Sequence, residues 1–124
     1  MNKFIPIHKH LLIKCFISEP IESQYLAQTF LSNIVTAIGM KAVTIPQAVY
    51  VADLGNEGFT GSINLATSHI AFHCWDVEGL LMLDVYSCKC FDSTIVIDMI
   101  TKYFGEIKSI NIMEIDRQTM EVIK

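Results

Sequence analysis

The chain has 124 residues, of which 52% are hydrophobic and 18% are charged, and its formal net charge is −4 at pH 7. This length predicts a single domain, residues 1–124, and the composition lies outside the disordered class. The 9 lysines and arginines are scattered along the sequence, so we expect no nucleic-acid partner. Because no apolar run reaches the roughly 18 residues of a membrane span, we also expect no membrane partner.

The four cysteines are too few and too irregularly spaced for a disulfide scaffold, and the motif CxxC does not occur. They are Cys15, Cys74, Cys88 and Cys90. We therefore expect free thiols and a cytoplasmic location; the roles of Cys74 and Cys90 stay open. Charged residues and histidines between His8 and Lys14 interrupt any signal-peptide core.

The hydrophobic pattern predicts strands where short apolar runs occur and helices where apolar residues recur every three or four positions. In chain order, the predicted elements are a strand at 10–17, a helix opening at Ser18-Glu19-Pro20 and ending at Gly39, an extended segment at 42–52, a loop at 53–61, strands at 62–67 and 69–75, a strand at 80–88, a helix from Asp92 to Gly105 and a strand at 106–116.

The residues at the boundaries of these elements suit those positions for physical reasons. Proline is tolerated in the first turn of a helix, which suits Pro20, whereas Pro46 marks the edge or a bulge of a sheet. Asp92 is a good N-cap, and glycine is the commonest helix terminator. With one break allowed near residue 68, the predicted order is β-α-β-β-β-α-β.

Strands clustered between two amphipathic helices favour an antiparallel sheet with both helices on one face. The predicted fold class is therefore α+β, a two-layer sandwich. The apolar content is high for so short a chain, so we expect part of it to lie in the interface of a homo-oligomer.

The segment ATSHIAFHCW, residues 66–75, is patterned like a buried strand but carries a hydroxyl, two imidazoles and a thiol. Buried polar groups are costly unless they are hydrogen-bonded, so the segment is either a well-satisfied core strand or a reactive site.

A zinc site built from His69, His73, Cys88 and Cys90 is one alternative, but two histidines four apart on a strand lie about 13 Å apart. We therefore expect no metal. Hydrolysis by a Cys-His or Ser-His pair is another alternative, and no local signature supports it.

A third alternative is self-cleavage before Ser68. A serine hydroxyl can attack the preceding carbonyl and convert the peptide bond to an ester, and elimination then leaves a dehydroalanine that hydrolyses to a pyruvoyl group. The reaction needs a strained backbone, a group that stabilises the oxyanion and a base for the Cα proton. Thr60, eight residues upstream, and His73, five residues downstream, supply a suitable hydroxyl and a suitable base.

The stretch GFTGSINLATSHIAFHCW, followed by GLLMLDVYSC, resembles the core of the small prokaryotic S-adenosylmethionine decarboxylases, which are pyruvoyl enzymes. The matching features are TG before a strand, SHI followed by histidine and tryptophan, then glycine, DV and a cysteine. Weaker similarity extends over nearly the whole chain. The combination of SHIxxH with a cysteine twenty residues past the serine is far more specific than any of its parts.

The resemblance implies a role for each matching residue. Ser68 becomes the pyruvoyl cofactor after cleavage between Thr67 and Ser68, which leaves a β chain of residues 1–67 and an α chain of residues 68–124. His73 is the processing base, Thr60 the processing hydroxyl and Cys88 the acid that reprotonates the substrate carbon. An ordinary thiol, with a pKa of about 8.5, is mostly protonated at neutral pH, as that role requires.

The resemblance further implies a substrate, a product and an assembly. The substrate amine of S-adenosylmethionine forms a Schiff base with the pyruvoyl group, which acts as an electron sink. The product is the aminopropyl donor for spermidine biosynthesis, and the family fold is an α+β sandwich that dimerises, here as a homodimer of processed αβ units.

Three positions depart from the family pattern. Thr67 stands where the family has glutamate, and Lys14 where its first strand has an acidic residue. The adenine-stacking aromatic has no clear counterpart, and Phe59 is the expected substitute; His69 is a candidate substrate contact. These departures leave two alternatives: a pyruvoyl decarboxylase of arginine or ornithine, and an unprocessed homologue that acts as a regulatory or binding subunit.

Overall fold

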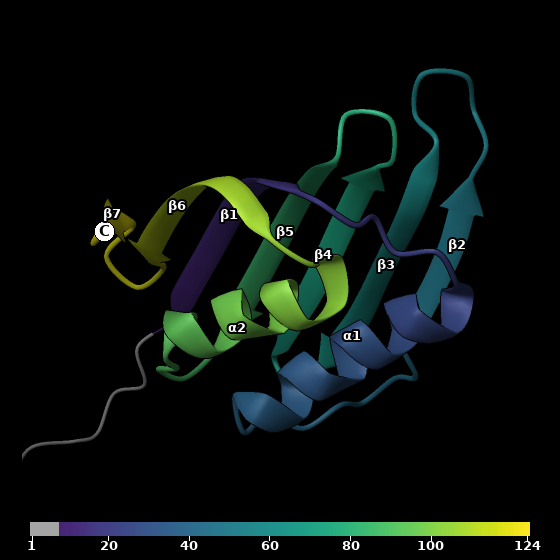
Figure 1. Ribbon diagram of the computed structural model, residues 1–124. Coiled ribbons are helices and arrows are strands. Elements are labelled where there is room, and N and C mark those ends of the chain that lie inside the picture. The colour runs from purple at the N-terminus through teal and green to yellow at the C-terminus, as the bar shows by residue number, and fades with distance from the viewer. Residues whose placement is uncertain (1–7) are drawn as a thin grey trace, which may run out of the picture.

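The computed structural model describes residues 8–124, which form seven strands and two helices (Figure 1). The elements are β1 Lys9–Ile17, α1 Gln24–Ala37, β2 Gln47–Val51, β3 Gly58–Leu65, β4 Ser68–Trp75, β5 Leu80–Ser87, α2 Ser93–Phe104, β6 Ile107–Asp116 and β7 Glu121–Val122.

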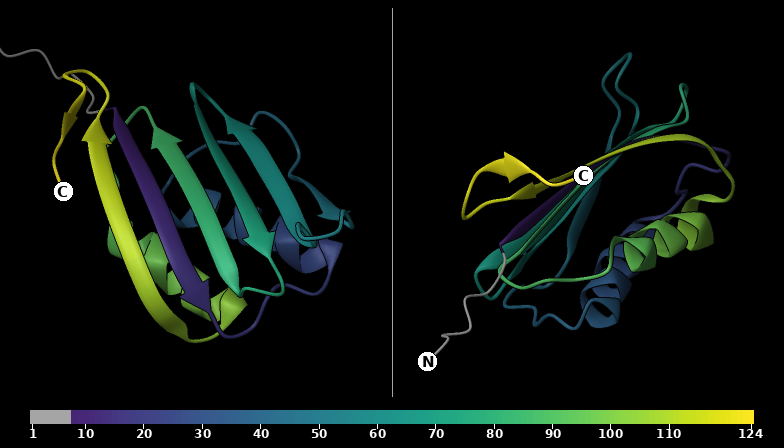
Figure 2. Two further views of the ribbon diagram at one scale, coloured as in Figure 1. Left: turned by 90° about the horizontal axis from the view of Figure 1, so that it is seen from above. Right: turned by 90° about the vertical axis from the view of Figure 1, so that its left-hand side faces the viewer.

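The strands make one antiparallel sheet in the order β2-β3-β4-β5-β1-β6-β7. Both helices lie on the same face of this sheet, so the molecule has one layer of strands and one of helices (Figure 2). The predicted α+β sandwich and the predicted element order are confirmed. The break expected near residue 68 is the turn between β3 and β4, and the short β7 extends the sheet beyond β6.

Several predicted boundaries are wrong by a few residues. Helix α1 begins at Gln24 rather than near Pro20, because the Ser23 hydroxyl caps it by accepting the Leu26 N–H at 3.1 Å. Strand β3 begins at Gly58, inside the predicted loop 53–61, because it pairs with β2 as far as Val51. The extended segment 42–52 is a regular strand only over Gln47–Val51.

The two helices are short. α1 has 14 residues and α2 has 12, below the roughly 20 that a helix needs to cross the hydrocarbon core of a bilayer. Within the part of the chain that the structure describes, neither helix is long and apolar enough for such a span.

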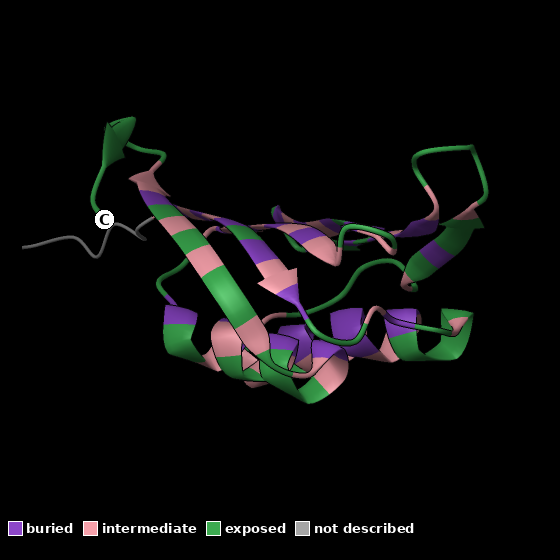
Figure 3. Ribbon diagram, turned by 45° about the horizontal axis from the view of Figure 1, so that its top comes forward, coloured by how far each residue is buried: buried purple, intermediate pink, exposed green. Residues whose placement is uncertain are grey.

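The core lies between the sheet and the helices, and burial alternates along the strands accordingly (Figure 3). Three fully buried rings hold its centre. Phe30 of α1 meets Phe72 of β4 and Phe104 of α2 edge-to-face, with centroids 5.4 and 5.1 Å apart. Such aromatic pairs contribute about 0.5–1.5 kcal/mol each beyond their buried area, so they fix both helices against the middle of the sheet.

The other face of the sheet carries no helix among residues 8–124, and we call it the open face (Figure 2). Its side chains come from the alternate positions of each strand, such as His69, Ala71 and His73 of β4. The residues of that strand that point to the helices are Ser68, Ile70, Phe72 and Cys74. The alternation therefore places Ser68 and Cys74 on the helix side and His69 and His73 on the open face.

A buried ion pair holds β1, β6 and the start of α2 together. The Lys9 ammonium lies 2.8 Å from a Glu114 carboxylate oxygen and donates to the Phe91 carbonyl at 2.7 Å. The Ser93 hydroxyl donates to the same carboxylate. Burial alone would raise the pKa of Glu114, but these hydrogen bonds and the charge of Lys9 outweigh it and hold the pKa below its ordinary value.

Glu114→Gln is expected to destabilise the protein by about 3 kcal/mol at pH 7, because it leaves the Lys9 charge buried without its partner. The stabilisation by Glu114 is fully present above its unfolded pKa of about 4.3 and is lost as the pH falls through the lower folded pKa. Urea denaturation from pH 7 to pH 3 should therefore show the parent and the variant converging in acid. Exposed Glu121→Gln is the control, and an unchanged gap at both ends of the pH range would contradict the account.

Candidate active site

The turn between β3 and β4 is strained at the predicted cleavage site. Leu65 pairs with Ser68, so only Ala66 and Thr67 form the turn, and Thr67 has φ 53°. This left-handed conformation is unfavourable for a β-branched residue by about 1–2 kcal/mol. The backbone strain that self-cleavage requires is thus found at the residue whose carbonyl would be attacked.

Ser68 is held at the end of β4, on the side of the sheet that faces the helices. It is 8% exposed, and its Oγ accepts the Cys88 N–H at 2.9 Å. The Cys88 Sγ lies 3.8 Å from the Ala66 carbonyl and donates to it. Cys88 follows β5 directly, so the ladder between β4 and β5 brings the predicted cofactor residue and the predicted proton donor together.

The thiol of Cys88 is not an ordinary one. The hydroxyls of Thr67 and then Ser68 hold the pKa of Cys88 below its usual value, with smaller help from a backbone N–H and the Lys89 charge. The two buried thiols show the opposite shift: burial raises the pKa of Cys15 to about 11 and that of Cys74 to about 12. The role expected of Cys88, as a mostly protonated proton donor, stays a prediction.

Thr60 and His73 form a second group, on the open face. They are cross-strand partners in β3 and β4, and Thr60 Oγ1 is hydrogen-bonded to His73 Nδ1 at 3.0 Å. This bond leaves the other ring nitrogen of His73 available to take a proton. Trp75, two residues further along β4, has its ring centroid 6.2 Å from that of the histidine.

The two groups do not meet within one chain. Ser68 and His73 lie five residues apart on β4, which is about 16 Å along a strand. Their side chains also point to opposite faces, since Ser68 faces the helices and His73 faces outward. The structure therefore brings Ser68 to Cys88 and Thr60 to His73, but it leaves the predicted base away from the predicted cleavage site.

A hollow of about 580 Å³ lies on the open face beside His73. Its floor is formed by β4, β5, β1 and β6, and Lys14, Met82 and Asn111 line it with the histidine. Met82 pairs with both Lys14 and His73, so the ammonium and the imidazole flank one methionine. Lys14 therefore faces the same hollow as the predicted base.

Four polar residues cluster at the other end of the open face. His10 is hydrogen-bonded to Asp84, and His69 Nε2 lies 3.7 Å from the same carboxylate oxygen. Arg117 Nη1 lies 3.0 Å from His10 Nδ1. Both ring nitrogens of His10 have a partner when Nδ1 accepts from Arg117 and Nε2 donates to Asp84, so the hydrogen bonds assign the proton to Nε2.

This cluster could not be predicted from the sequence, because its members come from separate strands that become neighbours only in the sheet. One nitrogen from each histidine and one Asp84 oxygen lie within 4.8 Å of one another, so these are the described residues that could hold a metal ion. A metal-bound imidazole, however, carries its proton on the second nitrogen and donates it outward. Arg117 is itself a donor there, so the arrangement fits a hydrogen-bond chain better than a metal site.

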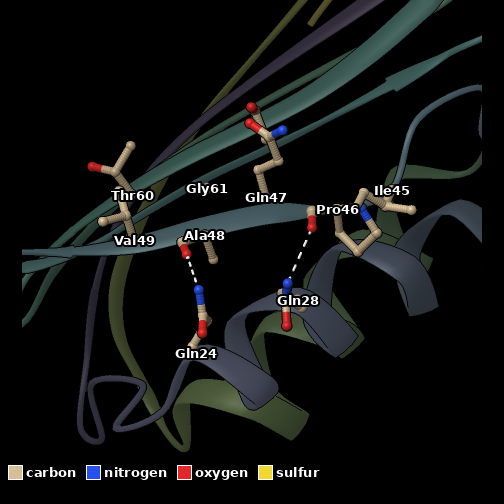
Figure 4. A pocket seen from close by; sticks show the side chains of 10 residues that line it. Gln24, Gln28, Ile45, Pro46, Gln47, Ala48, Val49, Thr60 and Gly61 are labelled. Atoms are coloured by element: carbon tan, nitrogen blue, oxygen red, sulfur yellow. Dashed lines mark hydrogen bonds between the residues drawn. The ribbon is translucent and has the colours of Figure 1, made fainter.

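A second, smaller hollow of about 410 Å³ lies at the edge strand β2, next to α1 (Figure 4). The side-chain amides of Gln24 and Gln28 reach from α1 and donate to the carbonyls of Ala48 and Pro46 at 2.8 and 3.2 Å. These bonds satisfy carbonyls that would otherwise be free on the sheet edge. Of the predicted site residues, only Thr60 lines this hollow.

Phe59 lies in the core rather than on the open face. It is 7% exposed and meets the Tyr50 ring edge-to-face, with centroids 5.3 Å apart. The aromatic side chain beside His73 on the open face is that of Trp75. The stacking role expected of Phe59 stays a prediction.

Comparisons with known proteins agree with this fold. A family model described as "S-adenosylmethionine decarboxylase" matches residues 9–118. The crystal structure of the adenosylmethionine decarboxylase from Aquifex aeolicus VF5 is similar in fold, with a TM-score of 0.71, 22% sequence identity and 90% of each chain covered.

Curated relatives match over a shorter segment. An S-adenosylmethionine decarboxylase proenzyme from Clostridium botulinum (strain Langeland) is 40% identical over 38 residues, which are 30% of this chain and 33% of the relative. The protein of that name from Thermoplasma volcanium is 47% identical over 32 residues, which are 26% of this chain and 25% of the relative. The matched segment thus spans a third or less of the length of these relatives.

Thr67→Asn tests the strain at the turn. Asparagine tolerates the left-handed conformation, so the variant is expected to be more stable than its parent by about 1 kcal/mol. Both proteins carry Ser68→Ala, which keeps the peptide bond intact, and stability is measured by urea denaturation. Thr101→Asn, on the exposed surface of α2, is the matched control and should change stability by less than about 0.5 kcal/mol. Equal stability of Thr67→Asn and its parent would mean that the turn stores no strain.

Proposed function

Because the chain belongs to the S-adenosylmethionine decarboxylase family, we propose that it is a pyruvoyl-dependent S-adenosylmethionine decarboxylase that cleaves itself between Thr67 and Ser68. The observation that carries the proposal is the left-handed Thr67 directly before the buried Ser68 hydroxyl, with Cys88 beside it. The product is the aminopropyl donor for spermidine biosynthesis, and the reaction takes place in the cytoplasm, where the four cysteines stay free thiols.

Cleavage begins when Ser68 Oγ attacks the carbonyl carbon of Thr67 and the peptide C–N bond breaks, which leaves an ester and a free amine. The strain at Thr67 is released as the peptide becomes an ester, which favours this step. A base then removes the Cα proton of Ser68, and the Cβ–O bond breaks with the Thr67 carboxylate as leaving group. The resulting dehydroalanine hydrolyses to a pyruvoyl group and ammonia at the new end of residues 68–124.

Cleavage also changes the surroundings of Cys88. The Ser68 hydroxyl, which helps to lower the pKa of Cys88 in the uncleaved chain, is lost. Thr67 gains a carboxylate at the end of residues 1–67, and a nearby negative charge favours the protonated thiol. Both changes favour the protonated thiol, which is the form that gives a proton to the substrate carbon. The pyruvoyl group supplies the electron sink for loss of CO₂.

His73 acts as the processing base from a second copy of the chain. Within one chain it is about 16 Å from Ser68 and on the opposite face, so a homodimer supplies what a single chain lacks. The open face suits this role because Leu12, Met82 and Met113 line its hollow together with His73. Two open faces packed together would bury these apolar side chains and place the Thr60–His73 pair of each copy in the interface.

Lys14 and His69 are the proposed substrate contacts on the open face. The ammonium of Lys14 would repel the sulfonium of S-adenosylmethionine, so we assign it to the substrate carboxylate. His69 lies beside Asp84, with its Nε2 3.7 Å from a carboxylate oxygen. Decarboxylation should therefore be assayed with S-adenosylmethionine, arginine and ornithine in parallel.

Intact mass under denaturing conditions tests the cleavage. The purified protein is expected to give two chains, residues 1–67 and residues 68–124, the second with a pyruvoyl end. Ser68→Ala should give one uncleaved chain, and Ser62→Ala, on the exposed side of β3, should be cleaved like the parent. A parent protein that keeps its full mass on long incubation would contradict the proposal and favour a regulatory or binding subunit.

Mixing two inactive variants tests the second copy. His73→Ala alone is expected to stay uncleaved, because it lacks the base, and Ser68→Ala stays uncleaved because it lacks the hydroxyl. Co-expressed with Ser68→Ala, which retains His73, the His73→Ala chain should be cleaved in up to about half of its copies, as expected when chains pair at random. Cleavage of His73→Ala on its own, or no cleavage in the mixture, would show that His73 does not act across the dimer.

A further inference from the structure

We propose that Cys88 and Cys90 form a reversible disulfide when the protein meets hydrogen peroxide, and that this bond switches off the decarboxylation by consuming its proton donor. The effect on catalysis rests on the proposed function, whereas formation of the disulfide does not. Nothing in the proposed reaction uses Cys90.

The two thiols are accessible, unlike the other two in the chain. Cys88 is partly exposed and Cys90 is exposed, whereas Cys15 and Cys74 are buried. In the uncleaved chain, hydroxyl groups around Cys88 favour its thiolate, which is the form that attacks a peroxide. Burial raises the pKa of Cys15 and Cys74 and so suppresses their thiolates. Oxidation is therefore directed to Cys88.

The backbone places the second thiol within reach. Side chains two residues apart point the same way, and in a straight strand their Cα atoms are about 6.7 Å apart, at the upper limit for a disulfide. The strand ends at Ser87, and the chain bends at Cys88 and Lys89, so the two cysteines are not held at the full spacing of a straight strand. The Ser87 hydroxyl accepts the Lys89 N–H at 3.1 Å and donates to the Lys89 carbonyl at 2.7 Å, so it holds the bend.

The chemistry balances with hydrogen peroxide as the oxidant. The Cys88 thiolate attacks one peroxide oxygen, the O–O bond breaks, and the departing hydroxide leaves as water after taking up a proton. The Cys90 sulfur then attacks the Cys88 sulfenic acid, the S–O bond breaks, and the thiol proton leaves with the hydroxide as a second water. Two thiols and one peroxide thus give one disulfide and two waters, and an added dithiol reverses the oxidation.

Mass spectrometry of the peroxide-treated protein tests the disulfide. We expect a loss of about 2 Da from the chain that holds both thiols, two of four cysteines protected from iodoacetamide, and full reversal by dithiothreitol. The loss falls on residues 68–124 if the protein is cleaved and on the whole chain if it is not. Peptide mapping should locate the bond at Cys88 and Cys90. Four alkylated cysteines, or a covalent dimer instead of an internal bond, would overturn the proposal.

Cys90→Ser separates this switch from direct damage to Cys88. The variant should decarboxylate S-adenosylmethionine like the parent before oxidation, because Cys90 is outside the catalytic groups. After peroxide it should gain oxygen at Cys88, and its lost activity should not return with dithiothreitol, whereas the parent recovers. Recovery of the variant to the same extent would overturn the switch while leaving the decarboxylase intact. If the disulfide forms but the reduced protein has no decarboxylase activity, the proposed function is overturned and so is the effect of the disulfide on catalysis. Formation of the disulfide itself then still stands.

Discussion

The structure depends on the covering of one face of the sheet by two helices. Phe30 and Phe104 reach from α1 and α2 to the same buried ring, Phe72 of β4, and fix both helices on that face. Every strand must then alternate between a buried and an open side. This alternation places Ser68 against the helices and His73 on the open face, two residues that the sequence places only five positions apart.

The same constraint divides the chemistry between two places. One place holds the buried Ser68 hydroxyl, the strained and exposed Thr67 before it and the partly exposed Cys88 thiol. The open side holds the imidazole and its threonine partner next to an apolar hollow. Within one chain, the proposed cleavage site and its proposed base therefore lie apart. The proposed homodimer would account for both this separation and an apolar content that is high for so short a chain.

Periodicity was enough to predict the fold class, because strands with alternating burial and helices with apolar stripes leave local signals. The N-cap at Ser23 was missed because Pro20 is also a plausible helix start, and only tertiary packing decides between them. The contact between Ser68 and Cys88 was predictable only through the family resemblance. The His10–His69–Asp84 cluster was not predictable, since its members lie on β1, β4 and β5, which become neighbours only in the sheet. The lowered pKa of Cys88 likewise depends on hydroxyls twenty residues away in sequence.

The central claim is that Ser68 becomes a carbonyl group that binds the amine of S-adenosylmethionine, and reductive trapping tests it most directly. The protein is incubated with sodium cyanoborohydride and either S-adenosylmethionine, arginine or ornithine, and the chains are then weighed under denaturing conditions. The account predicts a covalent adduct on residues 68–124 that forms most rapidly with S-adenosylmethionine and is absent in Ser68→Ala. An adduct that forms only with arginine or ornithine would contradict the proposed substrate, and no adduct with any amine would contradict the pyruvoyl cofactor itself.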